Sequence, residues 1–471
     1  MGDNFSLSFC ENISLLSKRL GVRENFDVIC RRLSAAAGEI AFFYIDGFVK
    51  DGVMQRTMQF VMSERELRSA EEFEKRIPYV EVEVSGEIDK VLTAVLSGQA
   101  AMLSPSFGDK VILIDMRTYP ARGTEEPEGD RVMQGARDGF VETLVMNTAL
   151  IRRRVRDERL RMEYFNLGGS SKTDVVVCYI DGVADREYLE KLRSVIRKIR
   201  PKSLTLGFQS LSESMIRKKW YNPFPKIRTT ERPDTAAAQV LEGSILVICD
   251  TSPEVMILPT AIFDYLQQTD DYYFPPLTGS YLRIVRTLIL ALSFVCTPLW
   301  YLALMYSDIL PAQLSFLIPR DAGALPIILQ LFLVEIAIDG LKIASMNTPG
   351  MLSNSLSIVG ALILGDFAVG IGWLSPDVIL YMAFVAIANF AQQNYELGYA
   401  FKFMRIILLG LTALLGVWGF LIGILLFILA VATNNTVASG KGYLYPLIPF
   451  NGRALMRLLL RSKKQDFNTT K

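Results

Sequence analysis

The sequence contains no histidine, which removes the side chain that most often serves as a general base and as a metal ligand. It also lacks a C-x-x-C pair, because its five cysteines are scattered: Cys10, Cys30, Cys178, Cys249 and Cys296. Cysteines inside apolar strings such as VVVCYI behave as small buried hydrophobes. We therefore expect no disulfides, no metal, no cofactor and a reducing compartment. The absence of a nucleotide-binding loop makes an enzyme the least favoured interpretation.

The chain has no excess of either charge sign, because it contains 50 Lys and Arg residues and 49 Asp and Glu residues. The balance hides an asymmetry: from Arg283 onward the chain has 13 basic and 8 acidic residues, and before it 37 and 41. The mildly acidic first part is not expected to bind nucleic acid. The N-terminus has no basic stretch followed by an apolar one, so we expect no secretory signal and a cytoplasmic first part.

Long apolar runs are confined to the second part of the chain. Five such segments follow one another: Ile284–Tyr306, Leu325–Ala344, Leu352–Leu374, Val378–Ala391 and Ile406–Ala432. About 20 apolar residues span the hydrocarbon core of a bilayer, so we expect a polytopic helical membrane domain. The flanking Lys and Arg residues, among them Arg283 and Arg286, place both ends of this domain on the cytoplasmic side, which requires an even number of crossings. One of the five segments is therefore expected to be re-entrant, interfacial or an in-membrane hairpin. The last segment is long, and Gly410, Gly416, Gly419 or Gly423 could break it.

The part of the chain before these segments contains a weak internal repeat. Glu39–Gly47 reads EIAFFYIDG and Asp174–Gly182 reads DVVVCYIDG, and each is a buried-strand pattern closed by an Asp-Gly turn. Apolar residues at helical spacing follow both strings, and Asp185 is the expected N-cap of the second helix. The predicted fold is an α/β cytoplasmic head of two related subdomains plus a polytopic α-helical membrane domain.

These patterns predict four regions in the chain. They are a first α/β subdomain (1–139), a second with a connecting helix (140–280), a helical membrane domain (281–435) and a basic amphipathic cytoplasmic tail (436–471). The tail is suited to the anionic leaflet of a bilayer. The connecting helix is expected over Phe140–Arg161, with its arginines on a solvated face. Asn222–Asp234 holds three prolines and is expected to be a stiff surface segment.

Ionisable residues inside the apolar segments are the candidate functional groups, because each costs free energy in lipid and usually faces a bundle interior or a water path. Glu335 and Asp339 are four residues apart, with Lys342 one turn beyond. Asp366 lies in the glycine-rich segment, where a break near Gly365 would place its carboxylate at the membrane surface. We take Glu335, Asp339, Gly365 and Asp366 as ion-path candidates. The alternatives are a local Asp339–Lys342 ion pair, a structural hydrogen bond from Glu335, and close helix packing through the small residues.

Five stretches stand out by their order and spacing: Gly139–Arg156, Lys172–Gly182, Asn222–Asp234, Leu241–Pro259 and Tyr395–Gly398. Together they resemble the A-subunit family of GerA-type spore germinant receptors. The strings DTSP (Asp250–Pro253) and NPFPK (Asn222–Lys226) bring the chain nearest to the SpoVAF branch of that family. Ala136 and Lys226 depart from the receptor pattern, which usually has proline and glutamine there. These departures argue against a direct nutrient-binding role.

The resemblance implies a multi-pass protein of the spore inner membrane, with its head on the cytoplasmic (core) side. Family A subunits are similar to oligomeric, pentameric ion channels that release monovalent cations, and the branch implies an accessory role that amplifies this release. The implied partners are further copies of the chain, a small membrane partner protein, germinant receptors, monovalent cations and the lipid bilayer. The predicted function is a subunit of an oligomeric ion channel acting in spore germination. A non-conducting scaffold or sensor and a secondary transporter are the alternatives.

Overall fold

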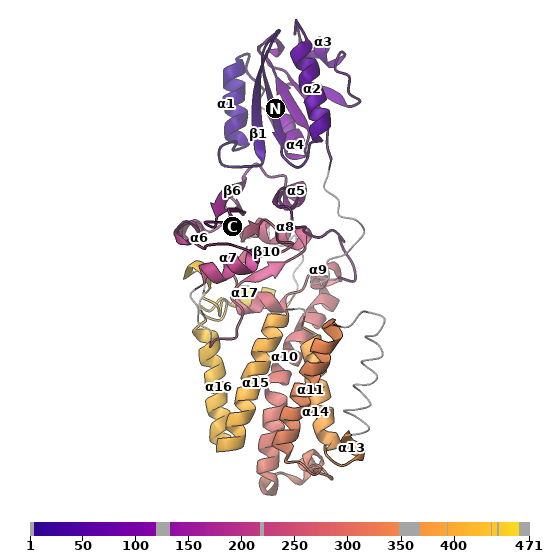
Figure 1. Cartoon of the computed structure of the whole chain (residues 1–471), viewed down its shortest axis with the longest axis vertical. Coiled ribbons are helices and arrows are strands. Elements are labelled where there is room, and N and C mark those ends of the chain that lie inside the picture. Colours follow the sequence, from indigo (N-terminus) through magenta and orange to yellow (C-terminus); the bar gives the residue numbers. More distant parts are fainter. Residues whose placement is uncertain are drawn as a thin grey trace. The chain divides into compact units, whose positions relative to one another are not determined.

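The computed structural model describes residues 4–118, 132–216, 221–347, 368–392, 394–434, 436–439 and 442–460 (Figure 1). The chain divides into two compact units. The first unit comprises Met1–Lys218, Ile227–Thr260 and Thr436–Lys441, and the second comprises Lys219–Lys226, Ala261–Asn435 and Gly442–Lys471. The chain therefore leaves and re-enters each unit, so residues that are neighbours in sequence can belong to different units.

The first unit contains a five-stranded antiparallel sheet of order β1-β2-β4-β5-β3. The elements of this first subdomain are α1 (Phe9–Arg19), β1 (Val28–Ala35), β2 (Gly38–Ile45), α2 (Asp51–Ser63), α3 (Ala70–Glu74), β3 (Val82–Ser85), α4 (Ile88–Leu96), β4 (Ala100–Leu103), the short 3₁₀ turn η1 (Pro105–Phe107) and β5 (Val111–Ile114).

A second antiparallel sheet in the same unit has the order β6-β7-β9-β10-β8, which is the same arrangement counted from its own first strand. Its elements are α5 (Leu144–Arg154), β6 (Leu160–Leu167), β7 (Thr173–Ile180), α6 (Arg186–Lys198), α7 (Phe208–Met215), β8 (Arg228–Thr230), α8 (Pro233–Leu241), β9 (Ile245–Cys249) and β10 (Val255–Leu258). The prediction of two related α/β subdomains is confirmed, and the two matching strings form the equivalent strands β2 and β7.

Each sheet is the middle layer between two layers of helices. Strand side chains alternate between the two faces. In β2, Phe43 and Ile45 pack with α1 and α4, whereas Ile40 and Phe42 pack with α2 and α3. In the second subdomain, α6 and α7 cover one face and α5 and α8 the other. Both faces of every central strand are therefore buried, which explains why these strands are almost continuously apolar in sequence.

Features of the head that depend on near neighbours in the sequence were predicted correctly. The Asp185 side chain accepts hydrogen bonds from the backbone N–H groups of Glu187 and Tyr188, as expected of an N-cap. Cys178 and Cys249 lie in buried strands, and burial raises the pKa of each thiol to about 12. They are small core residues, as the apolar strings around them indicated.

The predicted connecting helix Phe140–Arg161 is wrong in extent. It is helical only over Leu144–Arg154, and the chain then continues into strand β6. Its arginines are not all solvated either. Arg152 is 1% exposed and binds Asp27 of the first subdomain through Nε–Oδ2 and Nη2–Oδ1 distances of 2.5 and 2.9 Å. A buried arginine must be paired with a carboxylate, so this contact ties the two subdomains together.

The DTSP string has a structural role. The Asp250 side chain accepts a hydrogen bond from the backbone N–H of Leu144 at 3.0 Å, at the start of α5. The Ser252 hydroxyl accepts one from the N–H of Phe208 at 2.9 Å, at the start of α7. The first turns of both helices have backbone N–H groups without partners inside the helix. One loop therefore caps two helices on opposite faces of the second sheet.

The second unit is helical. Its elements are η2 (Ile262–Leu266), α9 (Asp270–Tyr273), α10 (Pro276–Met305), η3 (Ser307–Ile309), η4 (Ala312–Leu317), α11 (Ile327–Asn347), α13 (Ala368–Gly370), α14 (Pro376–Phe390), α15 (Tyr395–Leu415), α16 (Val417–Ala432) and α17 (Gly452–Leu459), whereas the short η6 (Val437–Ser439) belongs to the first unit. Among the described residues, α10 and α15 are long and apolar enough to cross a membrane, and α14 and α16 are shorter apolar helices.

Helices α11 and α14 run parallel to each other. At their beginnings, the Gln330 side-chain oxygen accepts a hydrogen bond from the backbone N–H of Ser375 at 2.7 Å. Towards their ends, Lys342 and Asn389 line the same small cavity. Asn347, which ends α11, therefore lies at the opposite end of the pair from the beginning of α14.

The long segment Ile406–Ala432, which its glycines could break, is divided between two helices. Helix α15 ends at Leu415 and α16 begins at Val417, with Gly416 between them at φ +59° and ψ −133°. The two helices then pack antiparallel (Figure 1), and a Cβ built on Gly423 would touch the Leu408 side chain. A helical hairpin is one of the three alternatives that the odd count of apolar segments left open.

Replacing Gly416 tests the hairpin. Its backbone conformation is open almost only to glycine, and an added Cβ would lie 2.7 Å from the Tyr306 hydroxyl oxygen. We expect Gly416→Ala to destabilise the purified protein by about 1–3 kcal/mol in thermal unfolding in detergent. Gly410→Ala is the matched control, because it lies within α15 with nothing within 4 Å of the added Cβ. An equal effect of the two substitutions would contradict the assignment of the reversal to Gly416.

Candidate functional site

Two carboxylates of α11 and two cations of α15 meet inside the helical unit, and we call Glu335, Asp339, Lys402 and Arg405 the charge cluster. The members of each pair are one helical turn apart, so each pair projects from one helix face. Arg405 Nη2 donates to Oε1 and Oε2 of Glu335 at 2.7 and 2.8 Å. Lys402 Nζ lies 3.0 Å from Glu335 Oε1 and also pairs with Asp339 Oδ2. Lys402 therefore bridges the two carboxylates.

The charge cluster is deeply buried on one side. The exposed fractions of the side chains are 2% for Arg405, 5% for Lys402, 9% for Glu335 and 35% for Asp339. Arg405 Nη1 also donates to the carbonyl oxygen of Ser293 on α10 at 3.2 Å. The equal numbers of positive and negative charges allow the four groups to lie among apolar side chains, where a single unpaired charge is costly. The cluster thus connects three helices.

Lys342 does not form the local ion pair with Asp339 that the sequence analysis left as an alternative. Asp339 pairs with Lys402 of another helix instead. The Lys342 ammonium lies 4.6 Å from the ring centres of both Tyr395 and Tyr399, which are one turn apart on α15. Two aromatic faces attract a cation by their quadrupoles, so this lysine is held beside the charge cluster without a carboxylate partner of its own among the described residues.

A small cavity adjoins the exposed side of the charge cluster. Its volume is about 20 Å³, and residues of α11, α14 and α15 line it, among them Asp339, Lys342 and Asn389. The side-chain oxygen Oδ1 of Asn389 is buried and has no hydrogen-bond partner in the described part of the chain. A polar cavity of this size has room for about one water molecule. The cluster therefore borders a position that water can occupy.

A second buried ionic group lies where α10 begins. Asp271 is fully buried and accepts hydrogen bonds from Arg286 at 3.1 Å through each of its oxygens and from Arg283 Nε at 3.3 Å. Arg283 Nη1 also donates to the backbone carbonyl of Leu458 in α17 at 2.9 Å. From the sequence, Arg283 and Arg286 were interpreted only as charges that mark the cytoplasmic side. In the structure they also hold α9, α10 and α17 together.

The proline-rich stretch predicted to be a surface segment lies partly in the helical unit, which corrects that prediction. Phe224 is 2% exposed and packs edge-on against Phe401 and Phe427, with ring centres 6.0 and 5.7 Å apart. Asn222 Nδ2 donates to the carbonyl oxygen of Ala430 at the end of α16, at 2.8 Å. In the sequence, Phe224 and Asn222 were the only signals that this stretch is buried. The NPFP string thus anchors the chain against the α15–α16 hairpin.

The structure brings two of the four predicted ion-path residues together, Glu335 and Asp339. Gly365 and Asp366 lie outside the described residues. Sequence reasoning missed Lys402 and Arg405 as the partners, although two cations one turn apart in an apolar helix were the available signal. Within the described ranges, no group of three or more His, Cys, Asp or Glu side chains could hold a metal ion.

The chain is similar to several known proteins. The profile of the family described as Bacillus/Clostridium GerA spore germination protein matches residues 14–471. Stage V sporulation protein AF of Bacillus subtilis (strain 168) is 38% identical over 459 residues, covering 96% of this chain and 92% of that protein. Uncharacterized membrane protein YfkQ of the same organism is 28% identical over 461 residues, covering 96% and 88%. The N-terminal domain of the A subunit of the Bacillus megaterium spore germinant receptor GerK3 is 23% identical, covering 55% of this chain and 96% of that domain, with a TM-score of 0.42.

The two carboxylates of the charge cluster are expected to differ in their contribution to stability. Glu335→Gln leaves the buried Arg405 without its anion and should destabilise the protein by about 3–5 kcal/mol. Asp339→Asn, one turn away and facing the same Lys402, removes a partly exposed charge and should cost less than about 1 kcal/mol. Thermal unfolding of both purified variants in detergent measures the difference. Equal losses would show that burial of the Glu335 pair does not hold the helices together.

Proposed function

The chain belongs to the GerA family of spore germination proteins, and on this premise we propose that it is a subunit of an oligomeric ion channel that amplifies cation release in germination. The channel is formed by the helical unit, and the head biases its opening. The observation that carries the proposal is the bridging position of Lys402 between Glu335 and Asp339 inside an apolar bundle.

Membrane insertion is supported by helix length. At 1.5 Å per residue, α10 with 30 residues and α15 with 21 residues extend about 45 and 32 Å, which suffices for a hydrocarbon core of roughly 30 Å. A relative that aligns with nearly all of the chain is named a membrane protein. We therefore treat the chain as a membrane protein with several crossings.

The distribution of charge supports a head on the cytoplasmic (core) side of the spore inner membrane. Arg283 and Arg286 lie in the first half of α10, towards its beginning. The connection between α10 and α11, at the other end, contains one basic residue, Arg320, and two acidic residues, Asp308 and Asp321. Positive residues accumulate on the cytoplasmic side of membrane proteins. In this orientation, the beginning of α10 and the head that precedes it in the sequence are on the core side of the membrane.

We propose that the charge cluster can adopt two arrangements. Lys402 contacts both carboxylates, whereas Arg405 contacts only Glu335. If Lys402 stays with Glu335, the partly exposed Asp339 is free to face the water-sized cavity and to attract a monovalent cation. A gate needs two discrete arrangements of packed groups that a second part of the protein can bias. Asp339 is accordingly our candidate at the cation path, and Glu335 and Arg405 support it.

The remaining parts of the proposal come from the resemblance and the sequence. The glycine-rich segment with Gly365 and Asp366 is proposed to line the path. The assembly is proposed to be a pentamer of this chain, acting with a small membrane partner protein and with germinant receptors. Monovalent cations are the proposed cargo, because the candidate path residues are carboxylates.

A non-conducting scaffold is the second candidate function. It is favoured by the complete pairing of Glu335 with Arg405, since a fully compensated buried ion pair also serves to fix helix positions without any transport. Such a scaffold would assemble and affect germination without carrying ions.

Ion flux decides between these functions. We expect protein-dependent potassium release from liposomes containing the purified full-length chain, alone or with a candidate membrane partner, at matched insertion. Asp339→Asn and Asp366→Asn should each lower the flux by about three- to tenfold, because a carboxylate at the path raises the local cation concentration. Asp308→Asn, in the exposed connection after α10, is the matched control and should leave flux unchanged.

The opposite results have distinct meanings. No flux under any pairing, from an oligomer shown to be folded, would contradict the channel and favour the scaffold. Flux that saturates with a solute and is coupled to it would favour a secondary transporter.

A further inference from the structure

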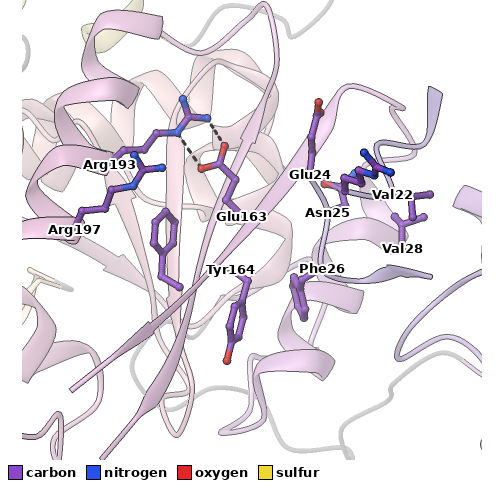
Figure 2. Close-up of a pocket in the computed structure, with 11 residues that line it drawn as sticks. Val22, Glu24, Asn25, Phe26, Val28, Glu163, Tyr164, Arg193 and Arg197 are labelled. Carbon is purple, nitrogen blue, oxygen red and sulfur yellow. Dashed lines mark hydrogen bonds and ion pairs between the residues drawn. The ribbon is translucent and has the colours of Figure 1, made fainter. Parts of the chain in front are cut away.

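Lys342 lines the same small cavity as Asp339, but it has no carboxylate partner in the described part of the chain. Arg193 in the head shows how a cation beside an aromatic ring is otherwise held. Its guanidinium lies 5.5 Å from the ring centre of Tyr179 and also binds Glu163, with an Nε–Oε2 distance of 2.9 Å. Figure 2 shows the Arg193 and Glu163 side chains pointing at each other. The partners of Lys342 among the described residues are aromatic faces instead.

The surroundings of the Lys342 ammonium suit any small cation. Its Nζ lies 4.6 Å from the ring centres of both Tyr395 and Tyr399, and a cation within about 6 Å of a ring centre is attracted by the ring quadrupole. This attraction requires a charge at the right place and no hydrogen on the cation. The buried Asn389 Oδ1, which has no partner in the part of the chain that the structure describes, lines the same cavity. Carbonyl oxygens of this kind replace the water around a bare metal cation.

The charge balance beside the cavity opposes a second cation as long as Lys342 is there. The charge cluster has two carboxylates and two cations and is therefore neutral, so Lys342 adds an uncompensated positive charge. A fixed positive group in a pore is an electrostatic barrier to cations. The remaining volume of about 20 Å³ has room for about one water molecule. Asp339 is thus shielded from a free cation by a cation of its own helix.

The Lys342 ammonium is held in a way that allows it to leave. Helix α11 ends at Asn347, five residues further on, which is about 8 Å along the helix axis. Lysines near the ends of membrane helices extend their apolar stems to bring the ammonium to the membrane surface. Attraction to aromatic faces is also weaker than a buried ion pair. Lys342 therefore has a second position available, which is the property that a gate requires.

We propose that Lys342 closes the cation path at rest, as an intramolecular cation that occupies a site for a free monovalent cation. The site consists of the ring faces of Tyr395 and Tyr399 and the oxygens of Asn389 and Asp339. When the ammonium moves out towards the membrane surface, a free monovalent cation takes its place. The closing of the path rests on the proposed channel function, whereas the cation site does not.

Chemical rescue tests the site without any transport. Lys342→Ala removes the ammonium and leaves the two rings, so that free propylammonium can take the vacated position. Thermal unfolding of the purified full-length variant in detergent is measured with about 50 mM propylammonium chloride, or with neutral propanol, at constant ionic strength. Propylammonium should raise the unfolding temperature of Lys342→Ala by about 2 °C more than that of the wild type. Propanol, which lacks the charge, should not.

Two further variants locate the bound cation. Lys198→Ala is the matched control, because this exposed lysine ends α6 in the head and should gain nothing specific from propylammonium. Adding Tyr399→Leu to Lys342→Ala removes one ring face and should weaken the binding about three- to tenfold, seen as a smaller temperature shift. The site is overturned if propylammonium stabilises Lys342→Ala no more than it stabilises Lys198→Ala, or no more than propanol does. An unchanged shift after loss of the ring would also overturn it.

Potassium release from liposomes tests the closing of the path. Lys342→Met keeps an apolar stem without the charge and should raise release about three- to tenfold, whereas Lys342→Arg keeps the charge and should stay near the wild-type rate. If the wild type conducts and Lys342→Met conducts no faster, the closing role is overturned although the channel stands. If neither conducts, the channel proposal fails and the closing role fails with it. The rescue experiment decides on the cation site in either case.

Discussion

The pairing of Glu335 with Arg405 is the contact on which the helical unit depends. Both side chains are buried among apolar helices, where either charge alone would be costly. Helices α11 and α15 must therefore stay in the register that joins them, and the bond from Arg405 to the Ser293 carbonyl adds α10 to the same arrangement. The position of Lys402 between two carboxylates follows from this register.

The strings that carry the family resemblance are junctions of the fold. Asp250 and Ser252 of DTSP cap the first turns of two helices on opposite faces of the second sheet. Phe224 and Asn222 of NPFPK hold a piece of chain against the α15–α16 hairpin. These residues join elements that are far apart in sequence. Their roles are structural, and the chemistry of the protein has to be sought in the charge cluster.

The sequence predicted what local patterns determine. The repeated strand and turn, the Asp185 cap, the apolar segments and the intramembrane carboxylates all depend on near neighbours. It did not predict the partners of buried charges, because these partners are far apart in the sequence. Asp27 pairs with Arg152, which is 125 residues away, and Glu335 pairs with Arg405, which is 70 residues away. The sequence offered four glycines that could break the last apolar segment and did not single out Gly416, because glycine is also frequent in membrane helices that continue straight. Such features are set by tertiary packing.

A charge exchange between the two buried partners tests the central claim most directly. Thermal unfolding in detergent is measured for Glu335→Arg, for Arg405→Glu and for the double variant. If their pairing holds the bundle, each single variant loses several kcal/mol by leaving like charges together, and the double variant recovers most of that loss. The recovery stays incomplete, because a carboxylate at position 405 no longer donates to the Ser293 carbonyl. A double variant whose loss equals the sum of the two single losses would contradict the account.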